Sequence, residues 1–508
     1  MNRKATMERT DPNPVLEPGH SYNSVTDSIT KLPFERLRRT PLVWVATTFV
    51  AFLLLLVFLY SVTYLFLTGV GVFGINIPVG WGFDIINFVW WIGIGHAGTL
   101  ISAILLLLRQ DWRTSINRFA EAMTLFAVAN AALFPILHLG RPWLFFYLMP
   151  YPNSMALWPQ FRSPLVWDVF AITSYMLVSL LFWFLGLVPD LATMRDKAQN
   201  IWAKRLFAML SFGWRGSARH WLHYTRVYFL MAALATPLVV SVHSIVGLDF
   251  AYGVVPGWHS TIFPPYFVAG AVFSGFAMVL TLLIPLRKVF GWTDFITRRH
   301  LDNMAKVMLA MGLVVAYGYL MEIFNAFYST DSFEIYNALD RVGGFYSPLY
   351  WGLILFNVIV PQLLWFRGVR RSLVVLWVIS IAVNIGMWIE RFIIISQSLS
   401  KDFLPSSWGL YFPSIWDVSI FIGTIGLFLT LLFLFIRVLP AISIFEMREL
   451  VHKLSHPHDS NGYAAGRTSG ARSHRTPPRR IIPDTAQRAG PEPGRENPRQ
   501  PKPRGRSE

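Results

Sequence analysis

The sequence predicts an all-α polytopic membrane protein with about ten transmembrane helices. Of its 508 residues, 54% are hydrophobic and only 14% are charged, whereas ordinary soluble domains contain about 25% charged residues. Several uninterrupted apolar segments reach the roughly 20 residues that cross a bilayer as a helix. The mean hydropathy of +0.46 agrees with this fold class.

The apolar segments divide the chain into three parts. Residues 1–41 are polar and contain no signal-peptide apolar core. Residues 42–440 hold the apolar segments, and residues 441–508 form a basic region that is rich in Pro, Gly and Arg after residue 454 and is expected to be largely disordered. The expected spans are 42–67, 84–108, 117–138, 164–187, 226–247, 264–286, 303–326, 348–366, 372–396 and 414–437.

The distribution of Lys and Arg predicts the orientation of the spans. Loops 68–83 and 248–263 contain no Lys or Arg. Loops on the other side contain many, and cytoplasmic loops of membrane proteins are enriched in these residues. We therefore expect both termini to lie in the cytoplasm of a bacterial cell, with the protein in its cytoplasmic (inner) membrane. The richest of the basic loops contains Arg195, Lys197, Lys204, Arg205, Arg215 and Arg219.

Charge and cysteine content exclude several functions. The net charge of +16 is explained by this loop asymmetry and by the basic tail, and we expect a contact with membrane lipid and none with nucleic acid. The chain has no cysteine. It therefore contains no thiolate-bound iron–sulfur cluster, no disulfide and no covalently attached c-type haem.

The segment 130–175 holds the principal candidate site. An apolar helix runs into His138, a loop rich in proline and aromatic residues follows, and a second helix starts at Pro164 with Asp168 one turn inside. A carboxylate inside a spanning helix costs roughly 2.5–3.5 kcal/mol on insertion scales and is usually kept for function. An imidazole and a carboxylate at the same membrane face suit proton abstraction from a diol such as a quinol.

Other ionisable residues lie in or at the ends of the expected spans. Each also has a structural interpretation: His138 could cap a helix C-terminus, Asp168 could complement a helix dipole, and Glu390 with Arg391 could form structural pairs. Convergence of several such groups at the outer face favours a site. The full set is Asp84, His96, Glu121, His138, Asp168, His243, Asp249, Glu322, Glu390, Arg391 and Asp417.

Two further interpretations concern histidines and buried acids. His138 and His243 could sandwich a haem, but the helices carry no second histidine pair, so we expect no metal-bound cofactor in this chain. His96, Glu121 and Glu322 could line a proton path, since embedded His and Glu often do. Hydrogen bonding between helices explains them equally well.

Three expected helices start with similar sequences at the outer side. These are SPLVWDVF at 163–170, SPLYWGLI at 347–354 and FPSIWDVS at 412–419. Proline suits the first helical turn because its missing N–H would have no partner there. The similarity indicates either repeated helical bundles or the same solution to starting a helix reached independently.

Three motifs resemble the NrfD/PsrC family of membrane quinone subunits. They are GIGHAGTL at 93–100, ILHLGRPW at 136–143 and SPLVWDVFAITSY at 163–175. Within that family the chain looks most like the ActC branch of bacterial alternative complex III, and the resemblance extends over about residues 40–440.

The resemblance implies two four-helix bundles with flanking helices and a site for quinol or menaquinol near the periplasmic face. His138 and Asp168 match the family's catalytic pair, Asp249 is the implied third quinol-binding residue, and His243 and Arg391 are further matches. The implied partners are a periplasmic iron–sulfur subunit that takes the electrons, c-type haem subunits, and a second NrfD-like membrane subunit. Proton translocation is proposed for such subunits, and His96, Glu121 and Glu322 are our extrapolation of its path.

Three other functions stay open on the sequence alone. The same site chemistry would serve the membrane anchor of a polysulfide- or nitrite-reductase-type complex. Buried carboxylates would also serve a proton-coupled secondary transporter. A structural scaffold that has lost its site is disfavoured by the intact pair of His138 and Asp168.

Overall fold

The computed structural model describes residues 14–35, 40–148 and 161–456. Within these ranges all regular elements are helices, and ten of them are long and apolar enough to cross a membrane. The prediction of an all-α polytopic membrane protein is confirmed. The spans are α2 (Leu42–Thr68), α3 with η3 and α4 (Phe83–Leu107), α5 (Asn117–His138), α6 (Pro164–Lys197), α8 (Ala218–Ala251), α9 (Phe263–Val289), α10 (Arg298–Tyr328), α12 with η6 and η7 (Ser347–Trp365), α14 with η8 and α15 (Leu373–Ser400), and α16 (Ile415–Val438).

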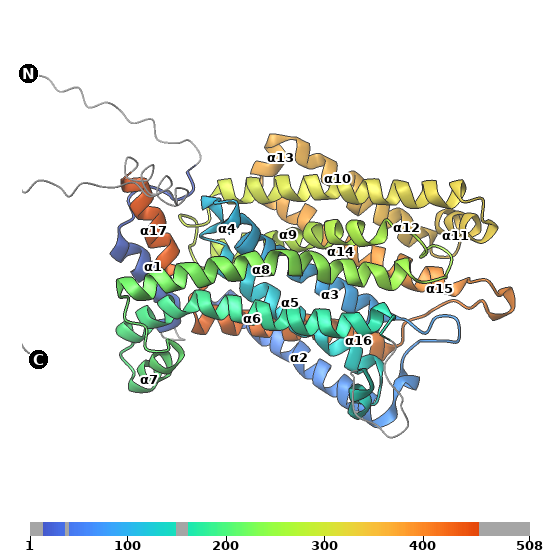
Figure 1. The fold of residues 1–508 in the computed structure, drawn as a ribbon, viewed down its shortest axis with the longest axis horizontal. Helices are drawn as coiled ribbons and strands as arrows, with labels where there is room; N and C mark the ends of the chain where they lie inside the picture. The colour runs from blue at the N-terminus through green and yellow to red at the C-terminus, as the bar shows by residue number, and fades with distance from the viewer. Residues whose placement is uncertain (1–13, 36–39, 149–160, 457–508) are drawn as a thin grey trace, which may run out of the picture. The chain divides into compact units, whose positions relative to one another are not determined.

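Shorter helices lie at the ends of the spans. Helices α1, α7 and α17 lie at one end of the molecule, and α11 and α15 lie at the other (Figure 1). We refer to these as the α17 end and the α11 end. The short helices are α1 (Tyr22–Phe34), α7 (Ile201–Leu210), α11 (Ser332–Gly343), α13 (Arg367–Arg371) and α17 (Ile444–Ser455), with single turns at η2 (Val70–Val72), η4 (Asp111–Arg113), η5 (Pro142–Leu148) and η9 (Pro405–Ser407).

Two helices extend well past the spans expected from hydropathy. Helix α6 continues to Lys197 and α8 already starts at Ala218. The additional turns are polar, so hydropathy alone did not include them in the expected spans. Helices α1 and α17 fall in the ranges 1–41 and 441–508, which the sequence analysis treated as terminal segments. The expectation of disorder for residues 457–508 concerns residues outside the described ranges.

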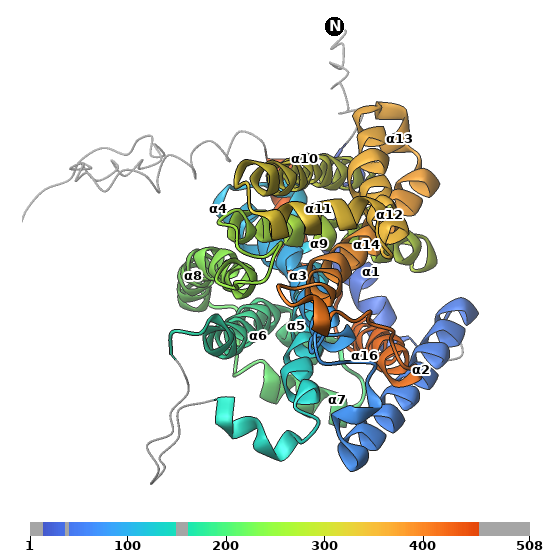
Figure 2. The ribbon, with the colours of Figure 1, turned by 90° about the vertical axis from the view of Figure 1, so that its right-hand side faces the viewer.

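The spans form two four-helix bundles. Helices α3, α5, α6 and α8 pack in a ring, and α9, α10, α12 and α14 pack in a second ring, with α9 against both α3 and α8. Helices α2 and α16 form a pair that flanks the first bundle through α5 (Figure 2). The arrangement implied by the family resemblance is therefore present. Every residue of α3 from Phe83 to Thr99 except Ile85 is buried, which makes this helix the centre of the molecule.

Glycines allow α3 to approach its neighbours closely. A Cβ atom on Gly98 would lie 2.1 Å from the Ala120 carbonyl oxygen of α5, and one on Gly275 of α9 would lie 2.9 Å from the Ala97 nitrogen. Helices in a membrane pack by close contact of small residues, because no hydrophobic effect drives them together there. Close packing therefore explains Gly98 and Gly275, and it sets the positions of the polar side chains between the helices.

Two of the three similar helix starts share a contact as well as a sequence. The Trp167 indole N–H donates to the Phe161 carbonyl before α6, and the Trp351 indole donates to the Val342 carbonyl before α12 (2.6 and 3.2 Å). Helix α16 begins differently, with a capping box between Ser414 and Asp417. The shared contact ties each helix to the segment before it, α6 to the loop at Phe161 and α12 to the last turn of α11.

We predict that Gly98→Ala destabilises the protein by about 1–3 kcal/mol, because the added methyl would force the backbones of α3 and α5 apart. Thermal unfolding of the purified protein in detergent measures the effect. Gly352→Ala in α12 is the matched control, since its Cβ would meet only the Ile389 side chain at 3.8 Å. The control should be neutral or slightly stabilising, and equal melting temperatures for the two variants would contradict the packing argument.

Candidate functional site

Each helix of the first bundle brings one titratable side chain to the α11 end. Asp84 is the second residue of α3, His138 the last of α5, Asp168 the fifth of α6, and Asp249 the third from the end of α8. We call these four the tip residues. Because consecutive spans run in opposite directions, their positions at alternating starts and ends bring all four to one face.

His138 and Asp84 form a hydrogen-bonded pair between α5 and α3. The His138 Nδ1–H donates to the Asp84 carboxylate, so in the neutral ring Nε2 is the nitrogen that can accept a proton. The Asp84 side chain is 3% exposed, whereas the His138 side chain is 30% exposed. The pair therefore has a buried acid that orients the ring and an imidazole that can be reached from outside.

The loop before α16 holds Asp84 in place. The Phe83 amide at the start of α3 donates to the Tyr411 hydroxyl over 3.1 Å, and the Ile85 amide donates to Asp84 Oδ1 over 2.9 Å. Burial, together with the nearby Asp417 carboxylate, raises the pKa of Tyr411 well above its usual range. The phenol therefore keeps its proton across the physiological range and serves as a neutral anchor for the start of α3.

Asp168 and Asp249 form a carboxyl pair between α6 and α8. Their carboxyl groups lie close enough to interact with each other, and one oxygen on each, Oδ1, is buried without a hydrogen-bond partner. Two buried carboxylates in contact repel each other, and a proton shared between them would relieve that repulsion. The pair is therefore suited to bind a proton or a hydrogen-bond donor.

His243 and Arg391 lie deeper than the tip residues. His243 precedes Asp249 by six residues on α8, about 9 Å along the helix, and its ring centroid lies 4.4 Å from that of His96. Its two ring nitrogens are buried and have no hydrogen-bond partner. Arg391 pairs with Glu390, and its guanidinium carbon lies 4.2 Å from the Phe267 ring centroid.

The structure thus sorts the five expected quinol-binding residues into three places. His138 pairs with Asp84, Asp168 pairs with Asp249, and His243 and Arg391 lie in the interior. Among the described residues, no hydrogen bond or ion pair joins His138 to Asp168. His138 and His243, the two candidates for a haem sandwich, do not face each other as a pair: His138 lies beside Asp84 and His243 lies beside His96.

The three residues expected to line a proton path lie at three depths. In mid-membrane, His96 places Nδ1 2.9 Å from the Ile92 carbonyl oxygen and Nε2 2.9 Å from that of Val239. A neutral imidazole has one N–H and can donate to only one of them. Glu121 belongs to a charged cluster at the α17 end, where Arg118 Nη1 lies 3.1 Å from its carboxylate.

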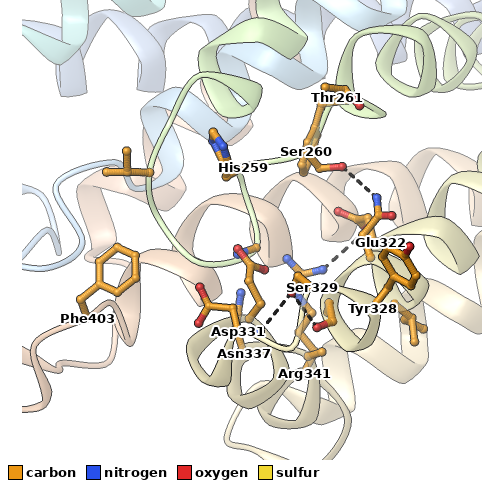
Figure 3. Close-up of a pocket in the computed structure, with 18 of the residues that line it drawn as sticks. His259, Ser260, Thr261, Glu322, Tyr328, Ser329, Asp331, Asn337, Arg341 and Phe403 are labelled. Atoms are coloured by element: carbon orange, nitrogen blue, oxygen red, sulfur yellow. Dashed lines mark hydrogen bonds and ion pairs between the residues drawn. The ribbon is translucent and has the colours of Figure 1, made fainter.

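Glu322 lines a cavity at the α11 end of the second bundle. The cavity has a volume of about 470 Å³ and lies between α10, α11 and the loop before α9. Figure 3 shows Arg341 directed toward Glu322, with 3.6 Å between its Nη1 and the Glu322 Oε2. The other Glu322 oxygen is buried without a partner. Arg341 is also held by Gln397 and Ser398, so it is a fixed positive charge in the wall.

Comparison with known proteins identifies the family. The family model described as polysulphide reductase, NrfD matches residues 71–401, which is more than half of the chain. The chain belongs to the NrfD family. The match includes both bundles up to the end of α14 and all four tip residues.

Two curated relatives show which kinds of protein this NrfD chain resembles. It is 27% identical over 236 residues to a putative membrane subunit of a dimethyl sulfoxide reductase from Halobacterium salinarum, covering 46% of this chain and 49% of the relative. It is 24% identical over 214 residues to a subunit of the selenate reductase from Mesobacillus selenatarsenatis, covering 40% and 47%. The chain thus spans about half the length of the curated relatives that it matches.

Two groups of contacts between titratable residues were not predicted from the sequence. Asp84 was recognised as an ionisable residue at a span end, but it was not assigned to His138, 54 positions away. Asp190 and Glu446 lie beyond the expected ends of their spans and were not considered, although both are buried near Glu121. The polar turns after the apolar window of α6 and the amphipathic pattern of 444–455 were the signals that could have found them.

We predict that Tyr411→Phe loosens the first turn of α3, because the Phe83 amide loses its acceptor. A hydrogen bond of this kind contributes about 1 kcal/mol, so amide hydrogen exchange in residues 83–88 should become about fivefold faster. Mass spectrometry of the exchanged peptides measures this. Tyr252→Phe, at an exposed tyrosine on the same end, should leave exchange there unchanged. An unchanged rate in Tyr411→Phe would rule out the anchoring role.

Proposed function

We propose that this protein is the integral membrane subunit of an oxidoreductase complex and oxidises a quinol at the α11 end of its first bundle. The observation that carries the proposal is the placement of one titratable residue from each of four adjacent helices at the same end of the first bundle. The imidazole of His138 and the carboxyl pair of Asp168 and Asp249 have nitrogen or oxygen atoms that can accept a proton. The redox centres that take the electrons would lie on partner subunits.

The tip residues have the capacity that quinol oxidation requires. Oxidation of one quinol to quinone releases two protons and two electrons. His138 Nε2 can accept one proton, and the buried carboxylate of Asp84 then stabilises the imidazolium, as an aspartate does in catalytic triads. The carboxyl pair, with one proton shared between its two groups, would accept the second, which would neutralise its remaining charge.

In the proposed reaction each pair of tip residues takes a proton from one of the two quinol hydroxyls. A hydroxyl at one end of the quinol ring would donate to His138, and the other hydroxyl would donate to a free oxygen of Asp168 or Asp249. Binding at the water-facing helix tips lets the protons leave on the outer side. His243 and Arg391, which lie deeper, would line the way toward the membrane interior rather than touch the quinol hydroxyls.

Two kinds of complex would use this chemistry. The motifs at 93–100, 136–143 and 163–175 favour an ActC-type member of alternative complex III, whose partners would be an iron–sulfur subunit, c-type haem subunits and a second NrfD-like membrane protein. The curated relatives favour the membrane component of a complex of the polysulfide, dimethyl sulfoxide or selenate reductase type. Family membership favours both over a secondary transporter.

Orientation and proton translocation belong to the same proposal. The Lys and Arg asymmetry supports an orientation in a bacterial inner membrane with the α17 end and the chain termini in the cytoplasm and the tip residues on the periplasmic side. Glu121, His96 and Glu322 would serve as stations between the two faces. Their placement at three depths supports this assignment, and the contact of His96 with His243 adds a second imidazole at the middle of the membrane.

Replacing the proton acceptors should abolish quinol oxidation while leaving the complex assembled. We expect His138→Ala and Asp168→Asn each to lower quinol-dependent reduction of the complex at least about a hundredfold, the contribution typical of a general base. A quinol analogue and optical detection of the reduced partner centres measure the rate. His259→Ala, at an exposed histidine of the same end, is the control and should retain full turnover. Full turnover in His138→Ala or Asp168→Asn would remove the site.

Asp84 should act through His138 without touching quinol. We expect Asp84→Asn to lower kcat about tenfold to a hundredfold, because the uncharged amide cannot stabilise the imidazolium and charge-assisted hydrogen bonds contribute roughly 1.5–3 kcal/mol. The KM should change little. A raised KM with an unchanged kcat would show instead that Asp84 shapes quinol binding.

Purification of the tagged chain from its native membranes distinguishes the two complexes. Co-purifying subunits with a c-type haem spectrum and a second NrfD-like chain support alternative complex III. A molybdenum-containing reductase subunit with an iron–sulfur subunit supports the reductase type. Recovery of the chain alone from intact membranes, under conditions that preserve other respiratory complexes, would count against both.

A further inference from the structure

A second group of titratable side chains is buried at the opposite end of the first bundle. Three carboxyl groups and two guanidinium groups meet there, and each side chain is at most 6% exposed. They come from η4, α5, α6 and α17. We call this group the α17 cluster, and its members are Arg113, Arg118, Glu121, Asp190 and Glu446.

Ion pairs and hydrogen bonds connect the α17 cluster. Arg118 lies between two acids, with Nη1 3.1 Å from the Glu121 Oε2 and Nη2 3.5 Å from the Asp190 Oδ2. Arg113 Nη2 lies 3.0 Å from both oxygens of Glu446. Arg113 and Glu446 also interact electrostatically with Glu121, so the charges of the five groups must be considered together.

The cluster contains one acid more than it has bases. With all groups ionised, three carboxylates and two guanidiniums leave a net charge of minus one. Guanidinium groups do not lose their protons in proteins, so the imbalance has to be met on the acid side. An uncompensated buried charge costs several kcal/mol, and a buried acid avoids that cost by taking up a proton.

Unpaired polar atoms around the α17 cluster mark a place for ordered water. The Tyr224 hydroxyl and Arg118 Nε have no hydrogen-bond partner. Both side chains are buried, with 7% of Tyr224 exposed and none of Arg118. The neighbouring Tyr228 hydroxyl donates to Glu121 Oε1 over 3.0 Å. Unpaired donors next to a charged group are positions where ordered water bridges polar atoms, and bridging water would let a proton move between the acids.

Helix α17 delivers the additional acid. Asp190 accepts from the Ile444 and Phe445 amides at the start of α17, both over 3.2 Å. Phe445 packs against Tyr224, with 5.2 Å between the ring centroids, and Met447 and Leu450 are buried. Glu446 also accepts from the Asn117 side chain over 3.0 Å. Without Glu446 the cluster would contain two acids and two bases and would be neutral.

We propose that the α17 cluster is a proton-binding site in which one proton is held among Glu121, Asp190 and Glu446. A proton is favoured over a metal cation, because within the described ranges no group of three or more His, Cys, Asp or Glu side chains is arranged to hold a metal ion. The other charged or titratable groups that face the site are Arg113, Arg118, Tyr224 and Tyr228. In the proposed function the site would take up protons at the cytoplasmic end of the path, but its existence does not depend on quinol oxidation.

Infrared spectroscopy of the full chain in membranes, at neutral pH and without quinol, tests the proposal. Protonated carboxyl groups absorb apart from carboxylates and amides. Removing any one of the three acids balances the cluster, so Glu121→Gln, Asp190→Asn and Glu446→Gln should each lose the intensity of one protonated carboxyl. The loss should not depend on which acid is replaced. Unchanged intensity in these variants would overturn the proposal.

Two further variants separate charge balance from structural damage. Arg113→Gln leaves three acids with one base, so the intensity should rise by one protonated carboxyl, a gain that loss of structure does not produce. Glu449→Gln changes an exposed acid of α17 and should leave the spectrum unchanged. A loss of intensity in Arg113→Gln would also overturn the proposal. Because no turnover is measured, failure of the quinol assignment leaves this test intact.

Discussion

Close packing of α3 is the constraint on which the rest of the structure depends. This helix contacts α5, α8, α9, α14 and α16, and a Cβ atom on Gly98 would clash with the backbone of α5. Such short distances between backbones set the angle and depth at which neighbouring helices meet. The polar side chains between these helices can then pair with one another, whereas the surrounding hydrocarbon would leave unpaired groups unsatisfied.

The pairing of polar groups follows from that packing and differs between the two bundles. In the first bundle each helix contributes one titratable residue to the α11 end. In the second bundle α12 has Gly352 where the similar start of α6 has Asp168. The acids of the second bundle lie elsewhere, at Glu322 beside the cavity and at Glu390 next to Arg391. Two bundles of similar architecture therefore differ in their polar groups, and among the described residues the imidazole and the carboxyl pair of the proposed quinol site lie in the first.

The first bundle contains polar groups along its whole length. Between the tip residues and the α17 cluster lie His96 and His243, and Tyr175 donates to the Gly95 carbonyl over 3.0 Å while contacting Thr99. Both ends of the bundle combine acids with a group that limits their net charge: a histidine at one end and two arginines at the other. Charge balance in a low-dielectric interior is thus the common physical principle of the two proposed sites.

The amino-acid sequence by itself determined the ten spans and the face at which His138, Asp168 and Asp249 lie, because apolar length and the alternation of helix direction are local properties. It also identified the family, through short motifs. Only the tertiary structure decided which groups meet: His138 with Asp84, Asp168 with Asp249, His243 with His96, and Glu446 with Arg113. These partners lie on different helices, as far apart as 333 positions, and their meeting depends on how closely the backbones approach, which no single segment specifies.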